Sequence, residues 1–276
     1  MVQWAGMIKV KVLNIQFDAV TLEEARQRVL DFLKRGIQGY IVTPNPEIIL
    51  EAEKNPSLVP ILNKAFLSIP DGIGILWAET YQRKLRHRHS FLGRFFTFIT
   101  TFTSLALLPR LSRKVFPERV TGTDLMQALC DSHLSYSIFL LGAMPGVAEK
   151  TAEILKKKNP NLDIIGTWSG SPRDEDFPEI KKEINALKPE ILFVAFGAPA
   201  QEFWIAKHLH ELPSVKVAMG IGGAFDFIVE KRKRAPKFMQ KTGTEWLFRL
   251  IQEPSRWRRI YNAAIRFPFY IAKRSR

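Results

Sequence analysis

The chain has 276 residues, of which 46% are hydrophobic and 25% charged, so its length supports a buried core and its composition excludes a disordered protein. The formal net charge of +14 indicates an anionic partner, while the single cysteine, Cys130, excludes an internal disulfide and suits a reducing compartment. The first residues, MVQWAGMIKVKVL, contain no basic segment leading into an apolar one, so we expect no secretory signal and a cytoplasmic location.

Short apolar runs alternate with helical patterns along most of the chain. In the first half, a helix over 21–35 begins with Thr21 and Glu24 at the spacing of a capping box. Strands are predicted at residues 12–17, 39–44, 65–72, 137–143, 162–168, 191–199 and 215–223. In the second half, helices that end near Lys158, Leu187 and His210 separate the strands. This order predicts an α/β fold, a Rossmann-like and mostly parallel sheet with helices on both faces.

Two segments depart from this alternation. Residues 91–108, FLGRFFTFITTFTSLALL, carry no charge after Arg94 and are too short to span a bilayer as a helix, which needs about 20 apolar residues. They predict either a buried helix pair or an interfacial membrane segment. After Lys241 the chain continues as basic, aromatic helix. We therefore expect a core at 1–241, with a hydrophobic basic insertion at about 80–117, and a helical appendage at 242–276.

The positive charge is concentrated in the same two regions. Residues 231–276 have a net charge of +12 and residues 83–119 a net charge of +8, so the remainder sums to −6. Such local charge indicates phosphate groups or an acidic membrane surface, with nucleic acid as the rival partner.

In parallel sheets, ligands bind beyond the carboxyl ends of the strands, so the loops there hold the candidate site residues. Asp71, in IPDGIG, is either a general base or the N-cap of the next helix, and spacing alone favours the cap. Gly142, Pro145 and Gly146 form either a tight turn or a helix N-terminus that exposes N–H groups to a phosphate or ribose.

The loop FVAFGAPAQEFW provides a similar turn at Gly197 and Pro199. In its first helical turn, Gln201 could hydrogen-bond a sugar hydroxyl, whereas Glu202 is expected only to favour the helix dipole.

Three other motifs are weaker. The loop with Gly220, Gly222 and Gly223 continues with Ala, Phe and Asp226, so it lacks the complete dinucleotide fingerprint. The DED triplet at 174–176 resembles the cation-binding pattern of sugar transferases but is typical of solvated surface charge. His208 and His210 lie two apart on a predicted helix, where their rings diverge, so no zinc site is expected.

Taken together, the loops resemble a known family. The chain is similar to the WecG/TagA/CpsF glycosyltransferases, which build wall teichoic acid and related bacterial polysaccharides. The matching segments run in order along the chain: TPNPE, IPDGIG, RVTGTDL, LLGAMPGVAEK, FVAFGAPAQEFW, GIGGAFDF, KRAPKFMQK and TEWLFRLIQEPSRWRR.

The resemblance implies a hexosyltransferase, inverting and independent of metals and other cofactors. It would move an N-acetylmannosamine-type sugar from a UDP-sugar to GlcNAc-diphospho-undecaprenol, working as a peripheral protein on the inner face of the bacterial cell membrane. The partners it implies are this donor, this acceptor and an anionic membrane surface, with no nucleic acid; whether the chain forms a homo-oligomer is left open.

The resemblance also implies roles for particular residues. Asp71 is expected to be the general base, in a pocket lined by Thr43, Asn45, Arg119 and Gln201. UDP is expected to contact Gly142, Met144, Pro145, Gly197, Pro199, Gly222, Gly223 and Asp226. The acceptor diphosphate is expected to contact Arg249, Arg256 and Arg259.

One departure from the family pattern stands out. Relatives connect PDGIG to RVTGTDL by a short segment, but here about 40 residues intervene. We predict that this insertion makes a second membrane contact, and it leaves open how close Asp71 lies to Arg119.

Two other function classes are weighed against this interpretation. A basic nucleic-acid-binding protein is suggested by the pI of about 9.9, but no known reader motif occurs. A nucleotide-dependent oxidoreductase would need an intact glycine fingerprint after the first strand, where the chain reads FDAVTLEE.

Overall fold

A computed structural model of the protein describes residues 8–86, 90–107, 115–131, 135–229, 235–236, 239, 245–252 and 254–275. The strands are β1 (Lys9–Val12), β2 (Ile15–Asp18), β3 (Gly39–Val42), β4 (Leu67–Ser68), β5 (Ile138–Gly142), β6 (Ile164–Trp168), β7 (Ile191–Ala195) and β8 (Val217–Gly220). The helices of the core are α1 (Leu22–Lys34), α2 (Pro46–Lys54), α3 (Leu58–Lys64), α4 (Ile73–Leu85), α5 (Phe91–Leu107), α6 (Gly122–Cys130), α7 (Val147–Lys158), α8 (Phe177–Leu187), α9 (Ala200–His208) and α10 (Ala224–Ile228). The C-terminal region contains α12 (Glu245–Gln252), α13 (Trp257–Tyr261), a π-helical turn (Asn262–Arg266) and α14 (Phe267–Arg274).

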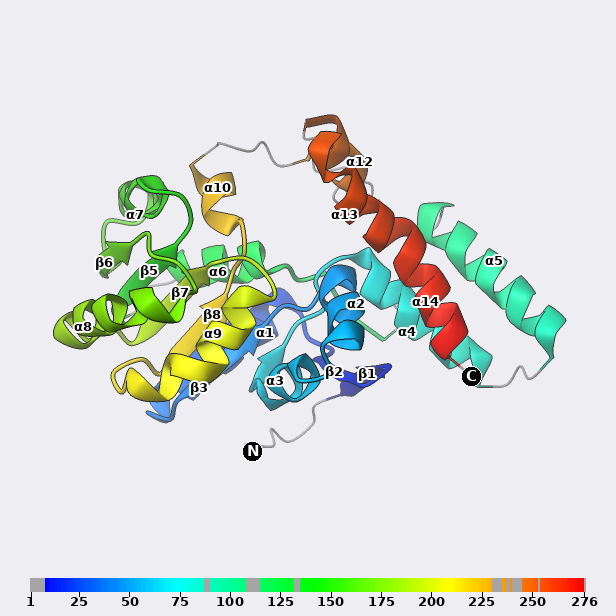
Figure 1. The fold of residues 1–276 in the computed structure, drawn as a ribbon, viewed down its shortest axis with the longest axis horizontal. Coiled ribbons are helices and arrows are strands. Elements are labelled where there is room, and N and C mark those ends of the chain that lie inside the picture. Colours follow the sequence, from blue (N-terminus) through cyan, green and yellow to red (C-terminus); the bar gives the residue numbers. More distant parts are fainter. Residues whose placement is uncertain are drawn as a thin grey trace.

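The central sheet has six strands in the order β4-β3-β8-β7-β5-β6, and every neighbouring pair is parallel. Strands β5, β7 and β8 are buried along their whole length, as expected when helices cover both faces of a parallel sheet. The predicted α/β class is therefore confirmed. Figure 1 shows the sheet between its helices, with α5 and the C-terminal helices gathered at the opposite end of the molecule from α7 and α8.

The segment predicted as one strand at 12–17 instead contains the last residue of β1, a turn and the first three residues of β2, which together belong to a hairpin. β1 and β2 pair antiparallel as a separate two-stranded sheet, and the turn between them places Leu13 at φ 53°. Asn14 is the one turn-favouring residue here, and a left-handed Leu beside it is uncommon, so the pattern was interpreted as a single strand. The capping box at Thr21 and Glu24 is confirmed, with both reciprocal hydrogen bonds present.

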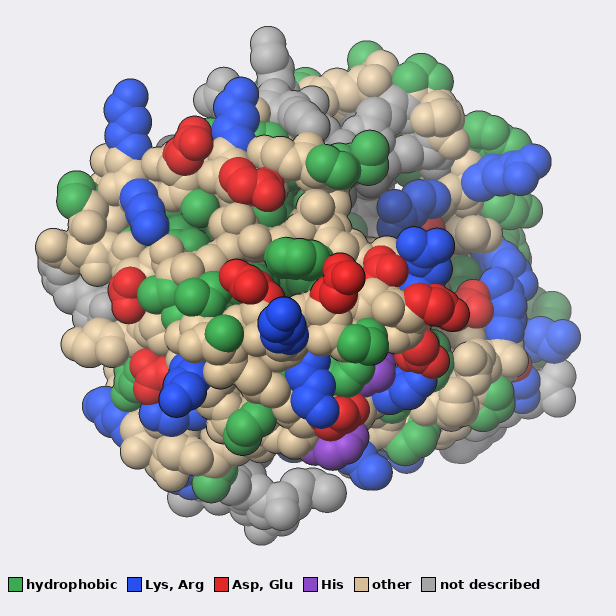
Figure 2. Space-filling view, turned by 60° about the vertical axis from the view of Figure 1, so that its left-hand side comes forward, with side chains coloured by type: hydrophobic (Ala, Val, Ile, Leu, Met, Phe, Trp, Pro, Cys, Tyr) green, Lys and Arg blue, Asp and Glu red, His purple; other side chains and the backbone are tan. Residues whose placement is uncertain are grey.

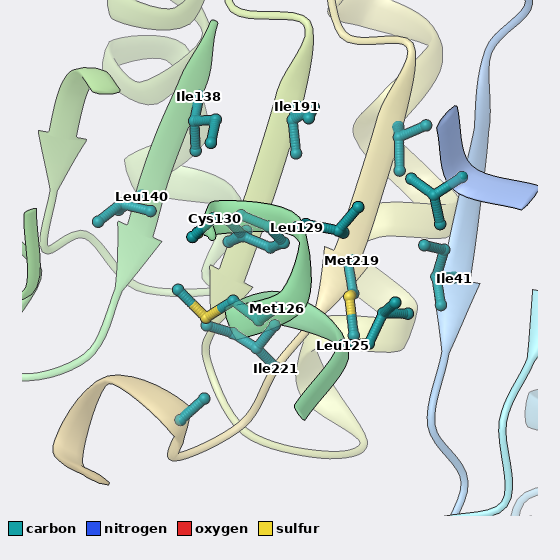
Figure 3. Packing of buried hydrophobic residues seen from close by; sticks show 14 of the residues in the cluster. Ile41, Leu125, Met126, Leu129, Cys130, Ile138, Leu140, Ile191, Met219 and Ile221 are labelled. Carbon is teal, nitrogen blue, oxygen red and sulfur yellow. The ribbon is translucent and has the colours of Figure 1, made fainter. Parts of the chain in front are cut away.

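Three hydrophobic clusters hold these layers together. One face of the sheet is covered by α1, α6, α7 and α10, and Figure 3 shows α6 side chains, among them Leu129 and Cys130, packed over Ile138, Ile191 and Met219. The opposite face is covered by α8 and α9. The third cluster joins the hairpin, α2, α3 and α4 to Phe267 and Ile271 of α14. The C-terminal appendage is thus anchored in the core through its last helix.

The insertion forms one long helix against α4 rather than a helix pair within the described residues. Trp77 of α4 donates a hydrogen bond from Nε1 to Thr101 Oγ1 of α5 at 3.2 Å, and the Phe98 and Phe102 rings meet Trp77 edge-on. Hydrogen bonding and aromatic packing together fix α5 on the core. Among the described residues, no helix is long and apolar enough to cross a membrane.

Candidate active site

Because all six strands of the sheet are parallel, their carboxyl ends meet at one edge, and the loops named by the sequence analysis lie together there. The loop after β3 contains Thr43 and Asn45, and the loop after the neighbouring β4 contains Asp71. The loops after β8, β7 and β5 follow in that order across the sheet. The strand order therefore places the TPNPE and IPDGIG loops side by side at one end of this edge.

The backbone of Asp71 is hydrogen-bonded to the loop after β3. Its backbone N–H donates to the Pro44 carbonyl at 3.0 Å, and the residue is partly exposed. The cap interpretation is wrong, because Gly72, at φ 93°, is the N-cap of α4 and no side chain caps that helix. The carboxyl group of Asp71 is therefore not assigned to capping α4.

Thr43 and Asn45 have different local roles. Thr43 is buried, and Gly122, the first residue of α6, approaches it so closely that a Cβ on Gly122 would lie 3.2 Å from Thr43 Oγ1. Asn45 is the N-cap of α2, and its Oδ1 accepts a hydrogen bond from the Ile48 N–H at 3.0 Å. Since Arg119 lies three residues before Gly122, the long insertion still returns the chain to the Thr43 end of the site.

Gln201 joins the loop after β7 to the loop after β8. Its side chain is buried, its Oε1 accepts from the Gly222 N–H at 3.0 Å, and its Nε2 donates to Glu202 Oε1 at 2.9 Å. Gly220 must be glycine for this arrangement, because a Cβ there would lie 2.6 Å from Gln201 Nε2. Gln201 therefore shapes the glycine loop, in addition to the sugar contact that the sequence predicts for it.

Glu202 was expected only to favour the helix dipole, but its side chain is buried, with 2% of its surface exposed. Burial raises the pKa of Glu202 from its ordinary 4.5 to about 7, against the hydrogen bond from Gln201, which lowers it. Its second oxygen, Oε2, has no hydrogen-bond partner within the described residues. Sequence reasoning missed this group, because an acidic residue in a first helical turn is ordinarily solvated.

The loops after β5 and β7 supply the residues expected to contact UDP. Gly142, at φ 99°, packs so tightly on the next strand that a Cβ would lie 2.9 Å from the Ala195 carbonyl carbon. Met144 and Pro145 are exposed beyond it, and α7 begins at the left-handed Gly146 without a side-chain cap. Gly197 and Pro199 occupy the matching turn after β7. This geometry is compatible with a phosphate or ribose near the start of α7.

The loop after β8 leads directly into α10. Gly223 is exposed, Gly222 is partly exposed, and Asp226 lies in the first turn of the helix and is partly exposed. The cluster of cations that follows, Lys231 to Arg234, lies outside the described residues.

The C-terminal appendage reaches the site through Arg259. Its guanidinium donates three hydrogen bonds to Glu47, in the first turn of α2, at 2.7 to 3.1 Å. Phe267 lies 3.6 Å from the position of a Cβ on Gly74, close to the Asp71 loop. The side chains of Arg249 and Arg256 lie outside the described residues.

The residues of the two motifs considered for metals contact other groups. Asp174, in the DED triplet, forms an ion pair with Lys207 at 2.6 Å, and Asp176 accepts a hydrogen bond from the Ser171 N–H. His208 is buried and stacked on Phe177, with ring centroids 3.7 Å apart. Among the described residues, no group of three or more His, Cys, Asp or Glu side chains could hold a metal ion.

The face turned toward the viewer in Figure 2 carries interspersed acidic and basic side chains, with hydrophobic ones in scattered patches. Ion pairs such as Lys181 with Glu211 join oppositely charged side chains at the surface.

Comparison with known proteins decides the family. The model of the glycosyl transferase WecG/TagA/CpsF family matches residues 10–101 and 100–276. The chain belongs to this family of glycosyltransferases. A protein of Bacillus spizizenii called N-acetylglucosaminyldiphosphoundecaprenol N-acetyl-beta-D-mannosaminyltransferase is 33% identical over 83% of this chain and 77% of its own length. A Staphylococcus aureus protein of the same name is 28% identical over 97% of this chain and 94% of its own length. The family resemblance predicted from the loop motifs is therefore confirmed.

Proposed function

We propose that this glycosyltransferase moves an N-acetylmannosamine-type sugar from a UDP-sugar to GlcNAc-diphospho-undecaprenol, in the synthesis of a teichoic acid-like surface polysaccharide. The acceptor and the sugar are those in the names of its relatives. The observation that carries the proposal is the 3.0 Å hydrogen bond from the Asp71 N–H to the Pro44 carbonyl, which joins the loop of the acid to that of Thr43 and Asn45.

The proposed reaction is a single displacement with inversion. The Asp71 carboxylate removes the proton from the acceptor hydroxyl, and that oxygen attacks the anomeric carbon of the donor. The bond from the anomeric carbon to the diphosphate oxygen breaks, and UDP leaves with the electron pair. Inversion accounts for a β-linked product, as in the relatives' names, if the donor is α-linked.

UDP gains negative charge as it leaves, so groups that stabilise this charge lower the barrier. We assign this role to backbone N–H groups of the turns at Gly142 to Pro145, Gly197 to Pro199, and Gly222 to Gly223, with Asp226 at the ribose or base. Arg249, Arg256 and Arg259 would contact the diphosphate of the acceptor when the appendage covers the site. Guanidinium groups form strong paired hydrogen bonds with phosphate oxygens, so this proposal requires no metal ion.

We also propose that the chain divides into two units by role. We assign residues 1–241 to the catalytic core and residues 242–276 to an appendage that covers the site. Because the proposed acceptor is anchored in lipid, we propose that the enzyme works as a peripheral protein on the inner face of the cell membrane.

The proposal is tested by measuring UDP release from UDP-ManNAc with a lipid-linked GlcNAc-diphosphate acceptor, in EDTA. We expect release only when both substrates are present, and less release when UDP-GlcNAc replaces the donor. Release that requires added magnesium would overturn the metal-free mechanism, and absence of acceptor-dependent release with either donor would overturn the proposed reaction.

A further inference from the structure

Helix α5 presents two apolar faces, and within the described part of the chain the core covers one of them. On the covered face, Thr97 and Thr101 are buried, and Phe98 packs against Tyr81 and Trp77 of α4. A helix that is apolar on all sides is normally covered on all sides. The second face of α5 therefore requires a partner.

The uncovered face is formed by large side chains at helical spacing. Phe91 is 81% exposed, and the same stripe continues with exposed Leu92, Phe95, Phe96 and Ile99. Between Phe91 and Leu107 the sequence contains no acidic residue, and its one cation, Arg94, donates from Nη2 to the Ser275 carbonyl at 2.5 Å. An apolar patch of this kind marks an interaction site.

The C-terminal helices extend this surface from a distant part of the sequence. Phe98 of α5 and Phe269 of α14 have ring centroids 5.6 Å apart, so the two helices are in contact. Phe269 is 63% exposed, and Trp257, Tyr261 and Ile265 precede it at four-residue intervals on the same exposed stripe. We call the exposed residues of α5 and of this stripe the apolar platform.

The charge around the apolar platform identifies its partner. The sequence from Pro254 to Arg276 contains no acidic residue, whereas Arg258, Arg266 and Lys273 are exposed there. A second copy of the chain would bring cations against cations, whereas an anionic bilayer supplies the opposite charge and an apolar interior. We propose that the apolar platform docks on an anionic lipid surface, with the Phe91–Ile99 stripe of α5 inserted among the headgroups.

This orientation suits the proposed function, on which the following step rests. Phe267, at the start of α14, lies beside Gly74, and Arg259 is paired with Glu47 next to the Asn45 turn. The apolar platform therefore borders the Asp71 edge of the sheet. With a bilayer on the apolar platform, the diphosphate of a membrane-anchored acceptor would lie on the same side of the protein as Asp71.

Vesicle flotation tests the proposal independently of catalysis. The full chain is floated with phosphatidylcholine vesicles and with vesicles that also contain phosphatidylglycerol. We expect binding only to the anionic vesicles, and about a tenfold or greater loss in the double variant Phe91→Ser/Phe95→Ser, because apolar area no longer leaves water. The matched control is Ile8→Ser, which removes an exposed side chain from the edge hairpin region and should bind normally.

A labelled cysteine reports insertion directly. Cys130 is buried, and burial raises the pKa of its thiol to about 12, so it should not react with a thiol-specific dye under native conditions. A polarity-sensitive dye on Phe96→Cys should therefore shift to the blue on anionic vesicles, whereas the same dye on Ile8→Cys should not shift.

Undiminished flotation of a folded Phe91→Ser/Phe95→Ser variant, or no dye shift at position 96, would overturn the proposal. So would a lipid-free dimer that the same double variant converts to monomer, because the partner would then be a second copy. If UDP release is absent but flotation and the dye shift behave as expected, the proposed function fails while the docking surface stands.

Discussion

The guanidinium of Arg259 holds the carboxylate of Glu47 with three hydrogen bonds between 2.7 and 3.1 Å, although the residues lie 212 positions apart. This pair connects the C-terminal appendage to the first turn of α2, next to the Asn45 cap. Arg259, which we propose to bind the acceptor diphosphate, is thus paired with a carboxylate at the edge of the site. An anionic ligand could replace Glu47 as the partner of this arginine.

Substitution of Arg259 should affect catalysis more than stability. Arg259 is half exposed and Glu47 a quarter exposed, so loss of the pair in Arg259→Ala should cost no more than about 1 kcal/mol of unfolding free energy, measured by urea denaturation. If Arg259 also stabilises the diphosphate, kcat/KM for UDP release should fall by roughly tenfold or more. Glu47→Gln is the control, since it breaks the ion pair but leaves the cation. Full activity in Arg259→Ala would remove Arg259 from the diphosphate site.

The variant Asp71→Asn should lose acceptor-dependent UDP release by about a hundredfold or more, because an amide cannot take the hydroxyl proton. The binding of UDP, measured by calorimetry, should change little. Asp163→Asn, at an exposed position before β6, is the matched control and should retain full activity. An Asp71→Asn enzyme with normal turnover would show that another group is the base.

Buried Glu202 makes stability depend on pH. Its pKa is raised in the folded state from 4.5 to about 7, so its stabilising contribution is complete below pH 4.5 and is lost as the pH rises through about 7. The variant Glu202→Gln cannot ionise and so avoids this loss. The change in unfolding free energy that the substitution causes should therefore be more favourable at about pH 8 than at about pH 4, by up to the order of 3 kcal/mol. Urea unfolding at both pH values measures this difference.

The comparison for Glu202 is Glu153→Gln, at an exposed position on α7, which should leave the pH dependence of stability unchanged. If wild type and Glu202→Gln show the same dependence, the carboxyl group does not titrate as its burial indicates.

Gly220→Ala should disturb the glycine loop, because the added methyl would lie 2.6 Å from Gln201 Nε2. We expect a loss of about 1–3 kcal/mol in unfolding free energy, together with weaker UDP binding. In a Gln201→Ala background the same substitution should cost less than about 1 kcal/mol, since the clashing side chain is gone. Equal costs in the two backgrounds would show that the contact with Gln201 is not the cause.

Local patterns in the sequence predicted the six strands of the central sheet, helices α1, α7, α8 and α9, and the motifs that carry the family resemblance. Thr21 and Glu24 begin α1 as their spacing predicts, since a capping box depends only on residues three apart. The strand-end loops were also predictable, because parallel strands place all their carboxyl ends at one edge. The left-handed turn at Leu13 was not, because its cause lies in the pairing of β1 with β2.

Only the tertiary structure decided the contacts between residues far apart in the chain. Whether Asp71 caps α4, whether Glu202 is solvated, and which face of α5 stays exposed all depend on what neighbouring elements cover. By itself, the sequence determined which side chains reach the edge of the sheet, through periodicity and turns. Their burial, and with it their charge and partners, was set by the packing of elements from opposite ends of the chain, which no local pattern encodes.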